Sequence, residues 1–311
     1  MNMKNNIEEI IIPVNLAPIV LFVYNRLNHT QQTIEALKQN IFAKESELFI
    51  YSDAPNNEES KKKVMEVRKY IKTISGFKNV VIIEREKNWG LAKSIIDGVT
   101  NIVNDYGKII VLEDDLITSP YFLKYMNDSL SFYQDKKEVW EIGGYVYPID
   151  IEKEKNTYFM PFTTSWGWAT WDDRWIHFER DPIKLVDTFS KKDIKRFNFD
   201  NCENVWNQVL RNYNGELYTW AIFWYAIIFL NKGLTVYPYK SMVKNIGHDG
   251  SGENCGTTNE YSTKLLREEI IVNNKNIKVD EKIYDDVKKY FKKKKISIVG
   301  RILNKLRRLF K

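Results

Sequence analysis

The strand-like run at residues 108–112 is followed by three consecutive acids, Glu113, Asp114 and Asp115. Its apolar part reads Ile-Ile-Val-Leu, which is typical of a strand buried on both faces of a parallel sheet. Carboxylates clustered at the end of a buried strand are costly unless a positive charge lies among them. A hard cation such as Mg²⁺ or Mn²⁺, shared with a phosphate-bearing substrate, is the usual solution. The pattern therefore predicts a metal and diphosphate site. A solvated turn with a helix-capping acid is the alternative, but three acids exceed what one cap needs.

Strand-like and helix-like segments alternate through the first half of the chain. The expected strands are residues 17–24, 48–52, 79–84 and 108–112, and the expected helices are residues 30–40, 58–74, 91–103 and 119–133. Alternation of this kind predicts a parallel sheet with crossover helices, in which ligands gather beyond the carboxyl ends of the strands. Arg26, Asp53 and the acidic triplet all follow expected strands, so we expect them along one edge of one sheet.

After about residue 140 the alternation loosens. Strands are expected at residues 140–147, 158–162 and 234–237, and helices at residues 205–211 and 219–231. There is no internal repeat and no Pro- or Ser-rich linker. We therefore expect the second half to complete the cleft of the first half rather than to form an independent unit.

The formal net charge of +6 is a property of the C-terminal tail. Residues 288–311 hold eleven of the 47 Lys and Arg residues and no acid, so the rest of the chain is net negative. We therefore expect no nucleic-acid partner. Cys202 and Cys255 form neither a zinc spacing nor a disulfide framework, which favours a reducing compartment. We expect no secretory signal, and no apolar stretch reaches the roughly 18 residues of a membrane span.

Several nucleotide-binding signatures are missing from the sequence. No Gly-x-Gly-x-x-Gly follows the first expected strand, and no P-loop occurs. This argues against a dinucleotide-binding dehydrogenase, a common methyltransferase and a P-loop kinase. Arg26 and Asp53 suggest a different nucleotide site, because a carboxylate can accept an N–H of a base and an Arg can face a base or a phosphate. Taken singly, each also fits a surface Arg or an ordinary turn.

Two aromatic-rich segments are candidates for ligand contacts. Residues 88–93 read Asn-Trp-Gly-Leu-Ala-Lys and open an expected helix, whose N-terminus and Lys93 would face an anionic ligand. A glycine-assisted turn is the alternative. Residues 165–173 hold three Trp around one Gly, and we interpret Trp166 and Trp168 as a wall for a sugar or acceptor. Trp at alternate positions is also common in protein cores.

The glycine-rich segment at residues 245–252 reads Asn-Ile-Gly-His-Asp-Gly-Ser-Gly. Its three glycines predict a flap that orders over a bound diphosphate, and a mobile surface loop is the alternative. His248 is a candidate metal or phosphate contact, and Asp249 is a candidate structural or catalytic acid.

Taken together, these motifs make the chain resemble glycosyltransferases of the GT-A fold, and it is similar to bacterial relatives of the N-acetylglucosaminyltransferase I family. The resemblance runs from about residue 18 to residue 252 and rests on the acidic triplet, the Trp-Gly-Trp block and the glycine-rich loop. It implies an α/β fold with a Rossmann-like, mostly parallel sheet flanked by helices. It also implies transfer of a sugar from a nucleotide-diphosphate donor, a UDP-sugar by preference, with Mn²⁺ or Mg²⁺ and with inversion.

The resemblance also implies roles for individual residues. The Asp-x-Asp motif of the family appears here as the acidic triplet, in which Asp115 would be the metal ligand, while Glu113 and Asp114 would contact the donor's sugar and ribose. An early Arg and the acid after the second strand match Arg26 and Asp53, which implies that both contact the nucleotide.

The base is harder to assign. An inverting transferase needs a group that takes the proton of the acceptor hydroxyl. In the animal enzymes the carboxylate precedes a helix near the stretch that matches residues 218–221, and Ala221 stands where that acid would be. The remaining candidates are Asp172, Asp173 and Asp249. We favour Asp173, because it follows the presumed acceptor wall.

The C-terminal tail has the pattern of an interfacial helix. Four consecutive lysines end at residue 295, and an apolar stripe with basic residues opposite follows it, formed by Ile298, Val299, Ile302, Leu303, Leu306, Leu309 and Phe310. This favours an amphipathic helix on an anionic membrane surface, to which each basic residue contributes about 1 kcal/mol. A helix docked on the body and a disordered tail are the alternatives. We expect a cytoplasmic protein, peripheral on the inner face of the cell membrane, with a glycan or lipid-linked acceptor.

The expected organisation is a GT-A catalytic domain at residues 1–260 and a C-terminal extension at residues 261–311. The domain would have a nucleotide-binding half at about 17–135 and an acceptor-side half at about 136–260. The leading function is a metal-dependent glycosyltransferase in surface polysaccharide or lipopolysaccharide synthesis. One alternative is a sugar-phosphate nucleotidyltransferase, which is disfavoured because no glycine-rich loop follows the first strand. The other is an inactive membrane-associated sugar-nucleotide- or glycan-binding module, which Ala221 favours.

Overall fold

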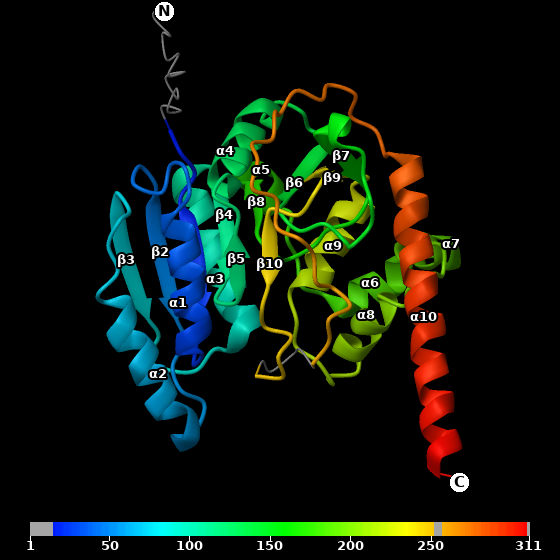
Figure 1. Cartoon of the computed structure of the whole chain (residues 1–311), viewed down its shortest axis with the longest axis horizontal. Helices are drawn as coiled ribbons and strands as arrows, with labels where there is room; N and C mark the ends of the chain where they lie inside the picture. The colour runs from blue at the N-terminus through cyan, green and yellow to red at the C-terminus, as the bar shows by residue number, and fades with distance from the viewer. Residues whose placement is uncertain (1–14, 252–256, 310–311) are drawn as a thin grey trace, which may run out of the picture.

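An eight-stranded sheet runs through the molecule in the order β3-β2-β1-β4-β8-β6-β9-β7 (Figure 1). The computed structural model describes residues 15–251 and 257–309, with the backbone alone described for 296–309. The strands of the large sheet are β1 (Ile19–Val23), β2 (Glu47–Ser52), β3 (Asn79–Glu84), β4 (Lys108–Glu113), β6 (Val139–Gly143), β7 (Thr157–Met160), β8 (Trp168–Trp171) and β9 (Leu234–Pro238). A second sheet pairs β5 (Leu116–Thr118) with β10 (Val243–Asn245).

The first half of the sheet is parallel. β3, β2, β1 and β4 run in the same direction, so their carboxyl ends lie at one edge. β8 is antiparallel to both β4 and β6, whereas β9 is parallel to β6 and β7 is antiparallel to β9. The α/β fold class predicted from the sequence, a mostly parallel sheet flanked by helices, is confirmed.

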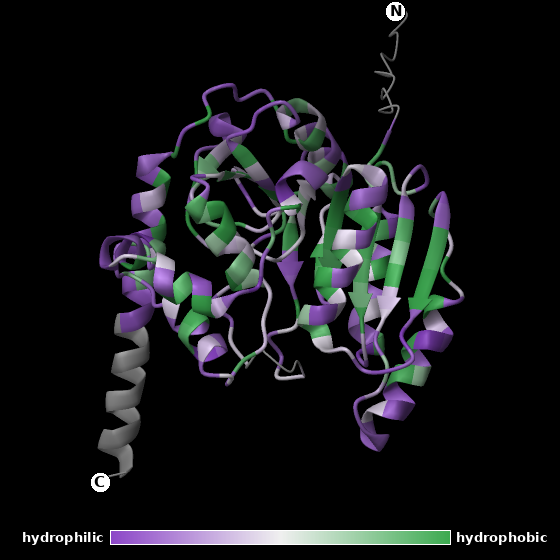
Figure 2. Cartoon of the chain, turned by 180° about the vertical axis from the view of Figure 1, so that it is seen from behind, coloured by the Kyte–Doolittle hydropathy of each residue, from purple (hydrophilic) through white to green (hydrophobic). Residues whose placement is uncertain are grey.

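Helices cover both faces of the parallel half. The helices are α1 (Leu27–Lys38), α2 (Glu58–Ile71), α3 (Gly90–Tyr106), α4 (Phe122–Tyr133), α5 (Asp172–Trp175), α6 (Pro182–Thr188), α7 (Lys191–Phe197), α8 (Trp206–Tyr213), α9 (Ala221–Leu230) and α10 (Glu281–Leu309), with a 3-10 turn at Lys153–Lys155. α1, α2 and α4 share one core cluster with one face of β1, and α3 and α9 share another with its opposite face. Figure 2 shows the resulting apolar strands between helices that are banded polar and apolar.

The strand β1 illustrates why this layering follows from the sequence. Successive side chains of a strand point to opposite faces. Ile19, Leu21 and Val23 accordingly join the cluster under α1 and α2, whereas Val20 and Phe22 join the cluster under α3. All five residues are buried, so the strand must be covered on both sides. Burial on both sides holds the carboxyl end of β1, and with it Arg26, at a fixed position beside β4.

The structure differs from the expected elements at several points: β5, β10, α6 and α7 were not expected, and two further differences are neighbours. The strand expected at residues 140–147 ends at Gly143, because the chain turns there to meet Gly167: the Gly144 N–H donates to the Gly167 carbonyl at 2.7 Å. A Cβ on Gly144 would lie 2.7 Å from that same carbonyl oxygen, so the approach requires glycine. The sequence reading also missed β8 as a strand, since its Trp-rich pattern resembled a ligand wall.

The C-terminal helix α10 begins on the body of the protein. Ile283, Tyr284, Val287 and Phe291 are buried in the core cluster of the second half. The side chains of the apolar stripe predicted from Ile298 onward lie outside the described residues. Within residues 15–251 and 257–309, no helix is both long and apolar enough to cross a membrane.

The first turn of α10 is capped by Asp280, which generates a stability prediction. Its carboxylate accepts the Ile283 N–H at 3.1 Å and pairs with Lys155. Burial opposes its charge, but the Lys155 contact and the Ile283 bond hold the Asp280 pKa below its ordinary value. We expect Asp280→Ala to lower the free energy of unfolding by about 1 kcal/mol, and Asp280→Asn to lose less, because Asn still caps.

The pH dependence of this contribution has a defined sign. Because the pKa of Asp280 is lower in the folded than in the unfolded state, its charge stabilises the fold at neutral pH. That stabilisation is lost as the pH falls through the unfolded value of about 3.9 and then the folded value. Urea unfolding of the wild type and Asp280→Asn should therefore converge at low pH. A gap of constant size from pH 7 to pH 3 would contradict this account.

Candidate functional site

A pocket lies at the carboxyl edge of the parallel strands. Its lining comes from the segment after β1, the ends of β2 and β4, and the first turn of α3: Phe22, Val23, Tyr24, Asn25, Arg26, Tyr51, Asp53, Asn56, Asn88, Gly90, Leu91, Ser94, Glu113, Asp114, Asp115 and Ser251. The parallel register pairs Phe22 with Glu113 and Val23 with Ser52, so the three strand ends deliver their polar residues at the same level. The structure thus brings together Arg26, Asp53 and the acidic triplet, as the sequence predicted.

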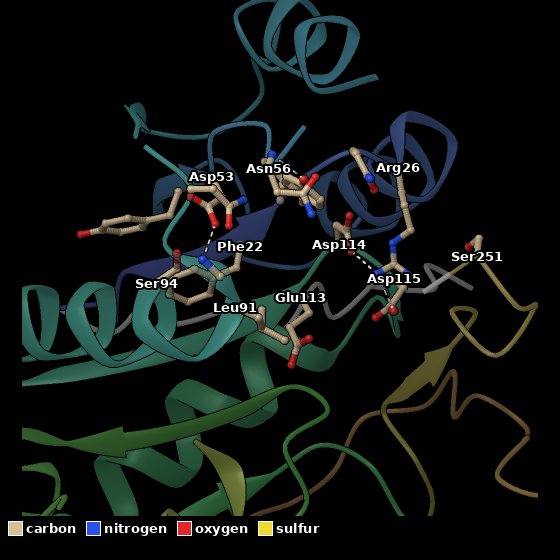
Figure 3. Close-up of a pocket in the computed structure, with 16 residues that line it drawn as sticks. Phe22, Arg26, Asp53, Asn56, Leu91, Ser94, Glu113, Asp114, Asp115 and Ser251 are labelled. Atoms are coloured by element: carbon tan, nitrogen blue, oxygen red, sulfur yellow. Dashed lines mark hydrogen bonds and ion pairs between the residues drawn. The ribbon is translucent and has the colours of Figure 1, made fainter. Parts of the chain in front are cut away.

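Arg26 lies between two of the three carboxylates (Figure 3). Its Nη2 pairs with Asp114 and donates to Asp115 at 2.8 Å. The three side chains are 16%, 6% and 8% exposed, so water screens the pair weakly. Burial opposes the guanidinium charge, but Asp114 and Asp115 more than offset it and raise the pKa of Arg26. In the absence of another cation, Arg26 is what compensates this part of the cluster.

The remaining charge of the cluster is not balanced. Desolvation, followed by repulsion from Asp115 and Asp114, raises the pKa of Glu113 to about 8. Desolvation also raises the pKa of Asp114 to about 6, although Arg26 acts against it. The Asp114 backbone is fixed by Thr33, whose hydroxyl donates to its carbonyl at 2.8 Å. A further cation beside these carboxylates would lower both pKa values.

Asp53 lies at the other end of the pocket and holds the start of α3. Its carboxylate accepts the Trp89 N–H at 2.9 Å and the Gly90 N–H at 2.8 Å. These are two of the N–H groups that a helix N-terminus leaves without an intrahelical partner. Phe22 and Tyr51 stack nearby, with ring centres 5.4 Å apart, and line the same end. This end therefore offers an aromatic surface and a carboxylate to a flat heterocycle.

The glycine-rich loop reaches the acidic end of the pocket. Pairing of β10 with β5 brings the Ile246 N–H to the Asp115 carbonyl at 2.9 Å. Gly247 lies so close that an added Cβ would be 2.0 Å from Asp115 Oδ2, so a larger residue there would displace the Asp115 carboxylate. The next residue, His248, is half-buried, and its two ring nitrogens are shielded from solvent without a hydrogen-bond partner among the described residues.

The groups at the acidic end suit a divalent cation. Asp114 Oδ2 and both His248 nitrogens are buried without partners in the part of the chain that the structure describes, and Asp115 is adjacent to both segments. Carboxylate oxygens with an imidazole nitrogen are ligands that Mn²⁺ accepts and Mg²⁺ accepts in part. Among the described residues, however, no three His, Cys, Asp or Glu side chains already form a metal-ligand cluster. The donor set fits a metal shared with a ligand better than a closed protein cage.

Several residues predicted for the site lie elsewhere. Lys93 is exposed on α3, with Nζ 4.3 Å from the centre of the Trp89 ring, and does not line the pocket. Trp168 is 1% exposed and stacks on Trp220 in the core, because β8 inserts it under α9. A buried Trp168 cannot form a wall for a ligand. Trp166, by contrast, is half-buried and lines a second pocket.

Asp173, the favoured candidate base, is also away from the acidic cluster. β8 runs antiparallel to β4 and pairs Trp171 with Lys108, so Asp173 lies at the edge opposite to Glu113. It forms ion pairs with Lys137 and Arg174, which pull its pKa down although burial opposes them. This geometry does not support a catalytic role for Asp173.

Asp249 lies next to the cleft, but its carboxylate is occupied by contacts with Ser251 and His29. The Ser251 hydroxyl and N–H donate to its carboxylate, and this lowers the pKa of Asp249 to about 2. His29 Nε2 lies 3.2 Å from the same carboxylate. The loop is thereby tied to the start of α1, and these contacts favour a structural role for Asp249.

The sequence reading missed the side walls of the pocket. Asn56, Asn88 and Ser94 line it, and the Ser94 hydroxyl is buried without a hydrogen-bond partner in the described residues. The sequence offered a signal for Ser94, because it lies in the first turns of the helix that begins in the 88–93 segment. Polar residues in those turns could have been predicted to line the pocket.

Residues 19–140 match the family model described as Glycosyl transferase family 2. The match runs from β1 into β6 and includes every lining residue of the acidic pocket except Ser251. It supports a glycosyltransferase that uses a nucleotide-sugar donor. No curated protein matches the chain by sequence.

Solved glycosyltransferase structures show a distant likeness. S. aureus TarS is 15% identical with a TM-score of 0.32, over 42% of this chain and 22% of that chain. TarS 1-349 is 13% identical with a TM-score of 0.43, over 73% of this chain and 59% of that one. The chain thus spans less than two thirds of either TarS structure. The mannosyltransferase PcManGT from Pyrobaculum calidifontis, in complex with GDP-Man and Mn²⁺, is 11% identical with a TM-score of 0.39, over 71% and 72%.

The Arg26 pairing generates a prediction about stability. Replacing Arg26 by Leu leaves two buried carboxylates without their partner, and removal of one member of a buried ion pair costs about 3 kcal/mol. Urea unfolding of Arg26→Leu in EDTA should show a loss of that order. The matched control is Arg211→Leu, which breaks an exposed pair with Glu216 and should cost below about 0.5 kcal/mol. Equal losses for the two variants would contradict a compensating role for Arg26.

Proposed function

We propose that the chain is a metal-dependent glycosyltransferase that moves a sugar from a nucleotide-diphosphate donor to a glycan or lipid-linked acceptor. The observation that carries the proposal is the shared pocket of Arg26, Asp53 and the acidic triplet, within the segment that matches Glycosyl transferase family 2. An aromatic end with a carboxylate suits a nucleobase, and an acidic end suits a metal-bound diphosphate. The two ends are joined by one cleft.

The residues of the pocket divide the donor between them. Asp53, Phe22 and Tyr51 would hold the base, while Glu113 and Asp114 would accept hydrogen bonds from ribose and sugar hydroxyls. Asp115, with His248, would hold Mn²⁺ or Mg²⁺, which supplies positive charge against the departing diphosphate. Arg26 already faces that position and would turn from the carboxylates toward phosphate oxygens.

The finer assignments extend the same proposal. A UDP-sugar, inversion at the anomeric carbon, kinship with the N-acetylglucosaminyltransferase I family and a role in surface polysaccharide or lipopolysaccharide synthesis agree with the motifs of the sequence. Transfer of a hexosyl or N-acetylhexosaminyl group is included. Residues 1–260 would form the catalytic domain, with residues 261–311 as its extension.

Donor binding is the first test of this function. A ligand that binds only the folded state raises the melting temperature by mass action, with about 2.7 kcal/mol gained at a concentration of 100 Kd. Thermal-shift measurements with UDP, GDP and their sugars should show a rise that requires Mn²⁺. Asp115→Asn should abolish the Mn²⁺-dependent part, whereas Asp187→Asn on the exposed face of α6 should retain it. A wild-type protein that no nucleotide diphosphate stabilises would count against the whole proposal.

Membrane association through α10 is the second part of the proposal. Lys292, Lys293 and Lys295 are exposed, and the helix continues through the basic and apolar residues that follow. Phe291 is buried and holds the first part of α10 on the body of the protein. The part of α10 that follows would then be free to contact an anionic surface. A peripheral position on the inner face of the cell membrane would bring the enzyme to a lipid-linked acceptor.

Deletion of residues 296–311 tests the membrane contact. Phe291 and the preceding apolar residues of α10 remain, so the body should keep its melting temperature. We expect the full chain to sediment with phosphatidylglycerol vesicles, to dissociate at high salt and to ignore phosphatidylcholine vesicles. The shortened chain should remain in the supernatant with all vesicles. Equal sedimentation of both chains would remove this part of the proposal.

A further inference from the structure

A second pocket of about 500 Å³ lies on the other side of the glycine-rich loop. Six segments that are separate in sequence form it: the turn after β6 with Tyr145 and Tyr147, the 163–166 stretch before β8, the loop that leads into α8, the start of α9, Tyr261 and the middle of α10. No motif of the sequence pointed to it as a whole. It lies in the half of the protein outside the segment that matches the family model.

Aromatic side chains make up one side of this pocket. The Trp166 ring packs edge-on against Tyr145 at 4.5 Å and against Tyr261 at 5.7 Å between ring centres. Tyr147 packs against Phe291 of α10 at 5.1 Å. These rings hold one another in fixed orientations and present both apolar faces and hydroxyls. Such a surface suits a sugar, whose ring has an apolar C–H face and a polar rim.

The glycine-rich loop contacts a residue of each pocket, Trp166 of the second pocket and Asp115 of the donor cleft. His248 packs against Trp166 with ring centres 5.2 Å apart and stacks on Tyr261 at 5.5 Å. Its neighbour Gly247 lies against Asp115 of the donor cleft. A ligand that rests on Trp166 is therefore separated from the acidic cluster by two residues of the loop, His248 and Gly247. The proposed donor and a second substrate could meet at this position.

Glu203 is the one carboxylate that lines this pocket among the described residues. Its Oε1 accepts the Asn204 N–H at 2.9 Å. Its Oε2 lies 3.8 Å from Lys294 Nζ, which is too long for a hydrogen bond, and its side chain is 24% exposed. Lys294 itself donates to the Tyr261 hydroxyl. One oxygen of Glu203 is thus held, while the other is available to a ligand.

The position of Ala221 makes this carboxylate informative. Ala221 begins α9 and lines the same pocket, at the place where the resemblance called for a catalytic acid. Among the acids of the first pocket, Asp114 and Asp115 pair with Arg26, and Asp53 accepts hydrogen bonds from the start of α3. Asp173 lies at the opposite edge of the sheet, and Asp249 is held by Ser251. Glu203 enters the same pocket from the loop before α8 instead.

We propose that this second pocket holds the sugar ring of the acceptor and that Glu203 accepts the proton of its attacking hydroxyl, an inference that rests on the proposed function. The acceptor oxygen forms a bond to the anomeric carbon as the bond from that carbon to the diphosphate oxygen breaks. The electron pair of that bond leaves with the nucleoside diphosphate, and the proton passes from Glu203 to water. Trp166 and Tyr261 position the acceptor ring.

Variants of Glu203 test this assignment while leaving the donor cleft intact. The probes are UDP-glucose, UDP-galactose and UDP-N-acetylglucosamine, each offered with Mn²⁺ and a panel of p-nitrophenyl glycosides, with release of UDP as the signal. We expect Glu203→Gln to lose at least 100-fold in glycoside-dependent release, as removal of a general base does. Its UDP-induced thermal shift should equal that of the wild type. Glu216→Gln, an exposed change beyond the end of α8, is the control and should retain release.

A second readout separates proton transfer from structure. Glu203→Ala leaves a space into which formate can diffuse, so added formate should restore part of the release in this variant and none in Glu203→Gln. Trp166→Ala should raise the KM for glycosides and leave the KM for the donor unchanged. These effects would not follow if Glu203 and Trp166 only supported the fold.

The outcomes also separate this inference from the proposed function. If UDP stabilises the wild type but no glycoside accelerates UDP release, or if Glu203→Gln releases UDP within threefold of the wild type, the assignment of the pocket and base is overturned while donor binding stands. If no nucleotide diphosphate stabilises the wild type, the proposed function fails with it.

Discussion

Burial of three neighbouring carboxylates at the end of β4 is the constraint around which the rest of the site is arranged. Pairing of β4 with β1 fixes the position of Glu113, and Asp114 and Asp115 follow it directly. Because the side chains of Asp114 and Asp115 are buried, water screens their charges weakly. A single guanidinium, that of Arg26, compensates two of them, and the raised pKa values of Glu113 and Asp114 show that this is insufficient for full ionisation. The cluster therefore attracts further positive charge. A fold that needed only stability would have little reason to keep it, because apolar residues would cost less.

The antiparallel pairing of β8 with β4 divides the large sheet into a parallel half and a mixed half. On one side the parallel strands end together and create the acidic pocket. On the other, β8 returns the chain in the opposite direction and carries Trp168 and Trp171 into the core. The segment before β8 lies at the second pocket, where Trp166 packs against His248 of the glycine-rich loop. One strand direction thus explains both why Asp173 is remote and why Trp166 is close to the cleft.

The sequence could predict the parallel half of the fold, because that half depends on local periodicity and on a simple rule about strand ends. The same rule brought Arg26, Asp53 and the acidic triplet to one edge. It did not place Asp173, because alternation of Trp does not reveal strand direction, and direction decides which edge a residue reaches. It did not place Trp168 either, because the face of β8 that carries this ring packs under α9 in the core. Glu203 could not be found from sequence, since its pocket is assembled from six separate segments and its neighbour Lys294 is 91 positions away. Loop contacts of this kind have no period.

The helix α10 connects the second pocket to the proposed membrane-binding segment. Its first three turns bury Ile283, Tyr284, Val287 and Phe291 in the core, so its position relative to the body is set by packing. Phe291 and Lys294, one turn further, line the second pocket, and the helix then continues to Leu309. At a rise of about 1.5 Å per residue, the end of the helix lies roughly 22 Å from Lys294. A surface bound by that segment would hold the pocket within a short distance of the lipid, which suits an acceptor whose reactive sugar lies close to its anchor. Because the same helix provides a wall of the pocket, any contact that shifts α10 must also change the position of Lys294 beside Glu203.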